Sequence, residues 1–421
     1  MKPLIGAVFA SIFLLGTNVY ADFSDDMETS AKVGIQFQDY SIHPQNKHGS
    51  NLTAYQELEL KYYHDNFKAY SKIYAQEDAA DAQEASEHNG RTFLRLDELY
   101  GQYDFDNSNI KLGKSIEFWG ALEVRNITDG FNPIDLRNDP SEKTNKLGVW
   151  NGAYTYYTDT GELSLIVKFY EQDQHLAQLP YVYYFLPSFI HYNSKLSSEK
   201  GRSYPSTYLK YSASTEWEMP LDYAVILEHG YDSQRYFNID GPLNGSPVNA
   251  QNRAYLVNKV STYNTLVVGS ALVKLEALYT DVIDNKDISD YYHVGAGIEY
   301  TIANFLENNG DLGLISEYYY YRTLEGDKYD DLGLFETMQN DLFLGLRYSF
   351  NDDSDSSFLG GVILDTQYIE QSYSMKYETR VNDVVNVKVD WQYIEPSVRA
   401  LTAYRLIGRH QRIGIDLSYS F

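Results

Sequence analysis

Residues 411–421 read QRIGIDLSYSF, and apolar and polar side chains alternate along this stretch. The side chains of an extended strand point alternately to its two faces. Ile413 and Ile415 therefore lie on one face, whereas Arg412 and Asp416 lie on the other. The stretch predicts a strand with one apolar face and one polar face.

The same period of two residues recurs along most of the chain, and helical periodicity is scarce. These segments predict about 18 strands. They lie near residues 30–40, 52–63, 67–76, 92–104, 109–118, 149–158, 162–170, 206–216, 221–230, 253–262, 270–280, 291–301, 311–322, 342–350, 357–368, 372–381, 385–393 and 411–421.

The connections between these segments alternate between short turns and long, polar, irregular stretches. The long stretches lie near residues 41–51, 77–91, 119–148, 171–205, 231–251, 323–339 and 395–409. A soluble β-sandwich has no reason to sort its connections by length, whereas an outer-membrane barrel has short periplasmic turns and long outer loops. We therefore predict an all-β fold, a transmembrane antiparallel β-barrel. The link near 369–371 is short where a long loop is expected, so a barrel of about 16 strands is the alternative.

Composition excludes several classes of protein. The chain of 421 residues carries a net charge of −25, and its mean hydropathy is −0.44. These values are incompatible with a bundle of spanning helices, each of which needs about 20 apolar residues. The negative charge argues against nucleic acid as a partner, because it would repel the phosphates. The absence of cysteine rules out disulfides, thiolate metal sites and a lipid anchor on cysteine.

The first residues have the pattern of a secretory signal peptide. A positive end at Lys2 precedes the apolar stretch 4–15, and Ala21 completes a small-residue cleavage site. We predict a signal peptide at residues 1–21 and a single barrel domain at 22–421. The barrel would lie in the outer membrane of a Gram-negative cell, in contact with its lipid and lipopolysaccharide.

The last residues resemble the C-terminal signal that the barrel-assembly machinery reads in outer-membrane proteins. The chain ends in an alternating strand with Tyr419 and a terminal Phe421. The resemblance implies that this machinery is a partner during insertion.

A more specific resemblance covers residues 92–140. The segment contains LDELYGQY at 96–103, IKLGKS at 110–115, FWG at 118–120 and DGFNPIDLR at 129–137. It resembles a proteobacterial barrel family of unknown function, whose members are discussed beside RND-type exporters, and alginate-export-type porins share part of the pattern. The resemblance implies an outer-membrane barrel with an inner-membrane exporter as a partner.

The third long stretch, near 119–148, is the candidate for a constriction of the barrel. Gly120 lets the chain turn away from its strand, and Asn132 with Pro133 fixes an extended bend. We predict that the loop folds into the lumen and forms an eyelet of mixed charge, with an exposed loop of solvated charges as the alternative. The residues proposed for the eyelet are Glu123, Arg125, Asp129, Asn132, Pro133, Asp135 and Arg137.

The fourth long stretch contains an apolar segment, residues 176–192, which we call the apolar loop. It reads LAQLPYVYYFLPSFIHY and contains no acidic residue, Lys or Arg, and its prolines prevent a helix. Such a segment rarely stays exposed. Three roles are open: it plugs the barrel mouth, touches the outer leaflet, or captures a hydrophobic solute. Its principal aromatic residues are Tyr181, Tyr183, Tyr184, Phe185 and Phe189.

The polar faces of the predicted strands carry charges of both signs. Pairing across strands inside the barrel accounts for most of them, and no preference for one charge sign follows. The residues proposed to face the lumen are Arg95, Lys111, Glu299, Glu317, Arg347, Lys388 and Arg412.

No catalytic, metal-binding or cofactor motif of known spacing occurs, so we predict no enzyme activity and no cofactor. The predicted function is an outer-membrane channel for small solutes, hydrophobic or amphiphilic ones included. Transport would be passive, or the channel would be the outer part of an export route. A barrel-borne hydrolase and a structural or adhesin barrel are the alternatives.

Overall fold

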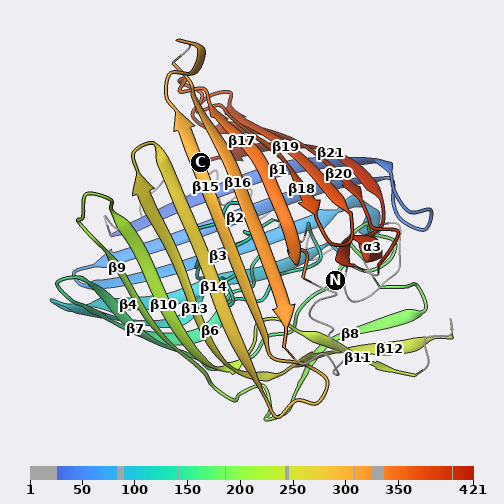
Figure 1. Ribbon diagram of the computed structural model, residues 1–421, viewed down its shortest axis with the longest axis horizontal. Helices are drawn as coiled ribbons and strands as arrows, with labels where there is room; N and C mark the ends of the chain where they lie inside the picture. Colours follow the sequence, from blue (N-terminus) through green and yellow to red (C-terminus); the bar gives the residue numbers. More distant parts are fainter. Residues whose placement is uncertain are drawn as a thin grey trace.

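The computed structural model describes residues 26–82, 90–139, 142–184, 186–241, 246–307, 309–324, 336–400 and 402–421. Within these residues, eighteen antiparallel strands close into one barrel (Figure 1). The predicted all-β barrel is therefore confirmed. The predicted signal peptide at residues 1–21 lies outside the described residues.

The barrel contains strands of eight to sixteen residues. In chain order they are β1 (Met27–Ile42), β2 (Ser50–His64), β3 (Phe67–Asp78), β4 (Phe93–Asp104), β5 (Ser108–Ser115), β6 (Val149–Tyr157), β7 (Gly161–Lys168), β9 (Ser206–Ser214), β10 (Leu221–Tyr231), β13 (Leu256–Val268), β14 (Ala271–Ile283), β15 (Tyr291–Ile302), β16 (Asp311–Thr323), β17 (Asn340–Ser349), β18 (Ser357–Asp365), β19 (Gln371–Arg380), β20 (Val385–Glu395) and β21 (His410–Ser420).

Each barrel strand pairs with its neighbour in the chain, and the last strand closes the barrel against the first. β1 pairs with both β2 and β21, and Lys32 lies opposite Ser420 in the closing register. The backbone N–H and C=O of Phe421 both bond to Ala31, at 2.9 Å. The ring of Tyr419, which is exposed, lies 5.6 Å from that of Phe421.

The two faces of the barrel differ as the alternation predicted. Along β21, Ile413, Ile415 and Leu417 are exposed, whereas Arg412 and Ser418 are buried. Exposed apolar side chains in this alternation form a surface for lipid, because a closed barrel satisfies its backbone hydrogen bonds internally. The barrel is thus that of an integral outer-membrane protein.

Two expectations about the connections are wrong. The short link 366–370 is a real turn between β18 and β19, so the alternative of 16 strands is excluded. The stretches 171–205 and 231–251 are not wholly irregular, because they contribute β8 (Ile190–Ser198), β11 (Tyr236–Asp240) and β12 (Val248–Ala254). These three strands form a separate small sheet beside the barrel, in which β12 runs parallel to β8 (Figure 1, lower right).

Helical structure among the described residues is limited to short segments. They are the 3₁₀ helices η1 (Ala79–Ala82) and η2 (Phe305–Glu307) and the α-helix α3 (Ala403–Ile407). In the part of the chain that the structure describes, no helix is long and apolar enough to cross a membrane.

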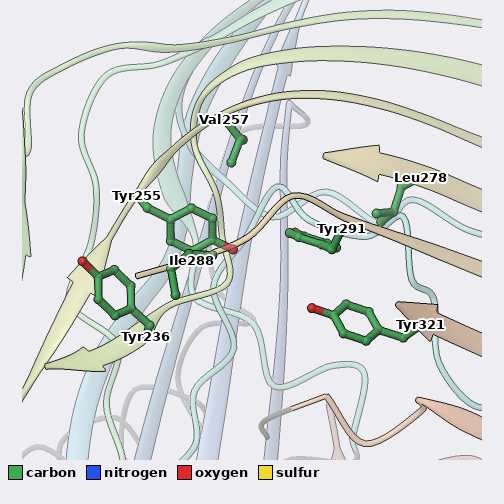
Figure 2. Packing of buried hydrophobic residues seen from close by; sticks show 7 residues of the cluster. All are labelled: Tyr236, Tyr255, Val257, Leu278, Ile288, Tyr291 and Tyr321. Atoms are coloured by element: carbon green, nitrogen blue, oxygen red, sulfur yellow. The ribbon is translucent and has the colours of Figure 1, made fainter. Parts of the chain in front are cut away.

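An aromatic cluster packs where β13 to β16 meet the loops. Tyr255, Tyr291 and Tyr321 pack here with Tyr236 of the small sheet and Ile288 of the β14–β15 loop (Figure 2). The cluster joins the small sheet to the barrel. The loops at this end are therefore packed against the barrel wall.

Candidate functional site

The segment between β5 and β6, residues 116–148, runs through the barrel to its opposite wall. We call it the inner loop. The backbone N–H groups of Ala121 and Leu122 donate to Oε1 of Glu276 on β14, at 2.6 and 2.9 Å. Those of Glu123 and Val124 donate to the two carboxylate oxygens of Glu317 on β16, at 2.6 and 3.0 Å. The sheet order places β14 and β16 far around the barrel from β5, so the inner loop spans the lumen.

The two wall carboxylates position the inner loop because they accept hydrogen bonds that its irregular backbone cannot make internally. Glu276 also accepts the N–H and the hydroxyl of Thr128, both at 3.0 Å. Burial raises the cost of an unpaired N–H, and a charged acceptor makes the stronger bond. Gly120 fits the same place: its φ is +141°, and a Cβ there would lie 2.8 Å from Glu276 Oε1.

Six of the seven predicted lumen charges contact the inner loop directly. The expected pairing across strands also occurs, as between Lys274 and Glu299 at 3.1 Å and between Arg412 and Asp390 at 2.7 Å. Arg347 bonds to Glu123 of the inner loop at 2.5 Å and to Glu299 of the wall at 3.0 Å. Glu299 therefore contacts Arg347 and not the inner loop itself. Four further ion pairs join the wall to the inner loop: Arg95 to Asp135 at 2.6 Å, Lys388 to Glu142 at 3.1 Å, Arg412 to Asp139 at 2.5 Å, and Lys111 to Glu117. Glu317 contacts the loop through the N–H groups of Glu123 and Val124.

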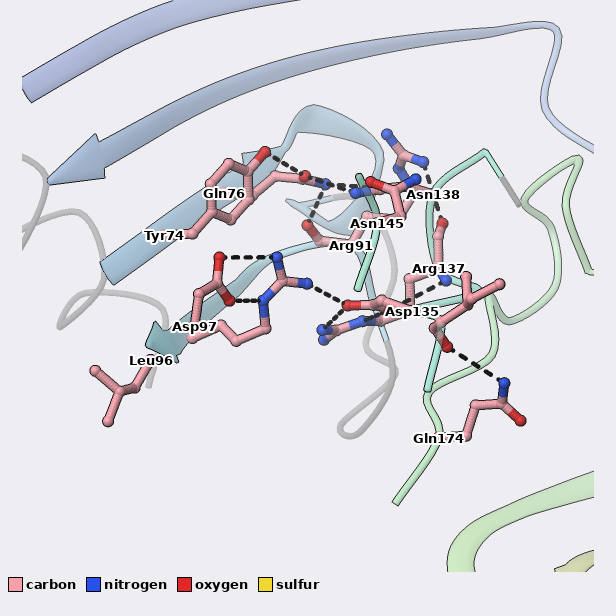
Figure 3. A network of polar contacts seen from close by, with 12 residues as sticks. Tyr74, Gln76, Arg91, Leu96, Asp97, Asp135, Arg137, Asn138, Asn145 and Gln174 are labelled. Carbon is pink, nitrogen blue, oxygen red and sulfur yellow. Dashed lines mark hydrogen bonds and ion pairs between the residues drawn. The ribbon is translucent and has the colours of Figure 1, made fainter. Parts of the chain in front are cut away.

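Asp135 is the centre of one of these contacts. It is fully buried and accepts bonds from Arg95 and from Arg137, whose Nη2 lies 2.6 Å away (Figure 3). Burial raises the pKa of Asp135, but the hydrogen bond and charge of Arg137, together with Arg95, outweigh it and bring the pKa to about 2. The carboxylate is therefore charged at any physiological pH, and the contact is an ion pair.

The base of the inner loop is closed by the Asn-Pro segment. The side chain of Asn132 donates to the carbonyls of Ser115 and Leu147, both at 3.0 Å, and the Pro133 carbonyl accepts the N–H of Leu147 at 2.8 Å. Asp129 forms an ion pair with Lys146. These contacts hold the two ends of the loop together where it leaves the wall.

Arg125 lies in the first third of the inner loop, against the opposite wall. Its N–H donates to the Tyr319 hydroxyl at 3.1 Å, and its guanidinium lies 3.4 Å from Glu336. Of the predicted eyelet residues, Glu123 and Arg125 thus lie at the far wall, and Asp129 follows Thr128, which bonds to Glu276 on that wall. Asn132 and Asp135 lie nearer the base of the loop. Arg125, Asp129 and Asn132 line one cavity. The eyelet of mixed charge remains a prediction.

The apolar loop packs over the inner loop and against other loops. Tyr181, Tyr183 and Tyr184 are buried, and the Tyr183 hydroxyl contacts Arg412. The Tyr184 hydroxyl donates to the carbonyl of Ile190 at 2.6 Å. Tyr184 and Ile190 belong to an apolar cluster that includes Val248 of the small sheet, and Phe189 packs against this cluster. Phe185 lies outside the described residues.

Backbone contacts tie the apolar loop to the inner loop and to the far side of the mouth. The N–H of Leu136 donates to His175 at 2.8 Å, and that of Ala177 donates to Leu136 at 3.1 Å. Across the mouth, Lys47 Nζ donates to the carbonyls of Val182 and Ile407, at 2.8 and 2.9 Å.

Two cavities lie beside the inner loop. The first, of about 190 Å³, lies on the side of the small sheet, and we call it the mixed cavity. Its lining combines apolar side chains with charges, including Ile127, Leu136, Phe237, Arg125, Arg235 and Lys259. The second, of about 180 Å³, lies between residues 138–139 and 142–145 of the inner loop and the wall of β1 to β3, β20 and β21, and we call it the amide cavity.

Sequence reasoning placed Glu276 and Glu317 in the lumen but missed that they hold the inner loop. Glu276 falls on the polar face of its strand, so its position in the lumen was readable. Its role as an acceptor of loop N–H groups depends on which wall the loop reaches, and a strand pattern carries no such signal. Among the described residues, no cluster of three or more His, Asp or Glu could hold a metal ion.

Comparison with known proteins supports the fold and does not identify a family. No protein-family model matches the sequence, and no curated protein is detectably similar to it. The resemblance of residues 92–140 to the barrel family therefore remains a prediction.

Solved structures are similar to the chain over nearly its whole length. One is a BenF-like porin from Pseudomonas fluorescens Pf-5, with a TM-score of 0.56, 8% identity, and coverage of 95% of this chain and 100% of that one. Another is OccK3 (OpdO) from Pseudomonas aeruginosa, with a TM-score of 0.55, 12% identity, and coverage of 96% and 97%. A third is the outer membrane protein opdK from Pseudomonas aeruginosa, with a TM-score of 0.52, 10% identity, and coverage of 95% and 100%. At this identity the likeness is one of fold, and the chain is a porin-like outer-membrane β-barrel.

Proposed function

We propose that this protein is a passive channel for small amphiphilic solutes, which pass the inner loop along the mixed cavity. The observation that carries the proposal is an inner loop anchored across the lumen, with a cavity beside it that has both apolar and charged walls. A wide barrel otherwise passes water and small solutes without much selection.

The lining of the mixed cavity supports an amphiphilic solute. Ile127, Ile134 and Phe237 offer apolar contact, while Arg235 and Lys259 carry charges beside them. Both cations have acidic partners, because Arg235 bonds to Glu171 at 2.6 Å and Lys259 bonds to Asp232 at 2.9 Å. Charges of both signs suit a dipolar head group, and the apolar patch suits a short hydrocarbon body.

Liposome swelling tests the proposal with two amino acids of nearly equal shape, free valine and free threonine. A methyl group in one is replaced by a hydroxyl in the other, so the pair isolates the apolar contact. Valine should enter severalfold faster than threonine through the native channel, and Phe237→Ser should abolish the difference. Equal rates through the native channel would contradict the amphiphilic preference. Absence of both swelling and bilayer conductance would contradict a channel.

The exporter partnership implied by residues 92–140 is a separate proposal, and co-purification with an inner-membrane exporter tests it. The hydrolase and adhesin alternatives draw no support from a specific group of described residues, so we do not propose them.

A further inference from the structure

The amide cavity differs in chemistry from the mixed cavity. Side-chain amides from both the wall and the inner loop line it, and none of its lining residues is aliphatic. The amides belong to Gln36, Gln38, Gln76, Asn138 and Asn145. An amide offers both donors and an acceptor, so this wall can bond to hydroxyl groups in either direction.

Amides of the wall and of the inner loop bond to each other here. Nε2 of Gln76 donates to the carbonyl of Arg91 at 2.8 Å, and Nδ2 of Asn138 donates to Oε1 of Gln76 at 3.2 Å (Figure 3). Asn145 donates to the carbonyl of Asp139 at 2.7 Å. The lining is therefore built in a fixed arrangement rather than left to mobile side chains.

Most of the charged residues around this cavity form ion pairs, whereas Asp416 accepts a hydrogen bond from the Tyr55 hydroxyl at 2.8 Å. Arg412 lies 2.5 Å from Asp139 and 2.7 Å from Asp390, and Lys388 lies 3.1 Å from Glu142. Paired charges occur in both cavities, so the amides and the lack of an aliphatic wall are what set this one apart, and they suit hydroxyl groups rather than a hydrocarbon body.

Two further features favour a hydroxylated compound. The rings of Tyr55 and Tyr74, both in the lining, stack 6.2 Å apart with an interplanar angle of 19°, which gives the wall a small aromatic surface. Arg412 is buried, and its Nε–H makes no hydrogen bond to a described residue. Aromatic surface with a few placed polar groups is the usual composition of a small-molecule site.

We propose that the amide cavity is a second solute site in the same lumen, which takes a small uncharged hydroxylated compound such as a monosaccharide or polyol. The inner loop lies between this site and the mixed cavity. The inference rests on the proposed function only in that solute reaches the cavity through the lumen.

The test uses D-glucose as the probe on the full chain in detergent, with binding followed by saturation-transfer NMR. Gln36→Leu combined with Thr144→Val removes polar groups from the amide cavity, and neither side chain hydrogen-bonds to another described residue. Gln234→Leu combined with Thr337→Val makes the matched change in the mixed cavity. The first pair should weaken glucose binding at least tenfold, and the second should change it less than twofold.

Failure of this inference can be distinguished from failure of the channel. If the native protein does not bind glucose, or if both pairs weaken binding equally, the second site is wrong even if bilayers show conductance. If glucose binds as expected but no conductance is seen, the site stands and the channel fails.

A second variant guards against a folding defect. Because the chain has no cysteine, Gln36→Cys can be folded first and then labelled with a thiol reagent. Labelling should abolish glucose binding, whereas unchanged binding would overturn the proposal.

Discussion

The inner loop and the apolar loop both lie inside or over the barrel, yet the principal contacts that hold them differ. The inner loop is anchored by carboxylates that accept its backbone N–H groups, as with Glu276 and Glu317. The apolar loop is held by packing, in which Leu176 and Ile190 meet Val248 of the small sheet. The inner loop also buries Leu122 and Ile127 against the far wall. Its irregular backbone still has N–H groups that need acceptors inside the lumen, and the wall carboxylates supply them through charge-assisted bonds. Segments that cover each other can exclude water and pack instead.

The largest effect should follow from removing the anchors of the inner loop. Glu276→Ala with Glu317→Ala removes acceptors whose charge-assisted hydrogen bonds contribute roughly 1.5–3 kcal/mol each. The inner loop should leave the far wall, and single-channel conductance should rise at least twofold. Glu59→Ala is the matched control, because that carboxylate bonds to Lys72 of the wall, at 3.1 Å, and not to the inner loop. Unchanged conductance in the double variant would show that other contacts suffice to hold the loop.

A smaller effect should follow from weakening the apolar loop. Leu176 is fully buried, and Leu176→Ala should cost about 2–5 kcal/mol of local stability. Limited proteolysis should then cut within residues 176–192, while the barrel keeps its heat-modifiable mobility on gels. Leu165→Ala, at an exposed position on the outer face of β7, should leave the proteolysis pattern unchanged. Equal resistance of both variants would mean that packing does not hold this loop.

The smallest effect should be a pH dependence that arises from Lys47. Burial lowers the pKa of Lys47 to about 8, whereas a solvated lysine titrates near 10.4. Lys47 binds its proton more strongly when the loops around it are released into solvent than when they are packed. Raising the pH from about 8 to 10.4 therefore favours the packed loops. Brief opening events in bilayer recordings should therefore be rarer at pH 9.5 than at pH 7. Lys47→Met should remove the dependence, and a native channel that opens more often at the higher pH would contradict the argument.

The sequence predicted the barrel strands well because lipid on one side and water on the other impose a strict period of two. The predicted ends of strands differ from the observed ends where the alternation weakens. The expected strand 253–262 stops short of Val268, because Ser261 to Asn264 place polar groups on both faces. The expected strand 109–118 overruns Ser115, where the chain bends into the lumen.

The small sheet could not be predicted from local pattern. β8 and β12 pair in parallel across a long stretch of chain, and the sequence of Ile190–Ser198 lacks alternation. For the site, residue type indicated that the inner loop would bring charges into the lumen. Their partners depend on the loop's path, so neither Glu276 as an anchor nor the separation into two cavities could be derived.

The anchoring of the inner loop has a consequence for the order of assembly. The loop is made early in the chain, and its acceptors follow 155 residues later at Glu276 and 194 residues later at Glu317. Contacts over such separations form only after the intervening chain has been ordered. Until the late strands join the wall, the backbone N–H groups of the inner loop lack these two acceptors. The inner loop therefore narrows the lumen only in the last steps of assembly.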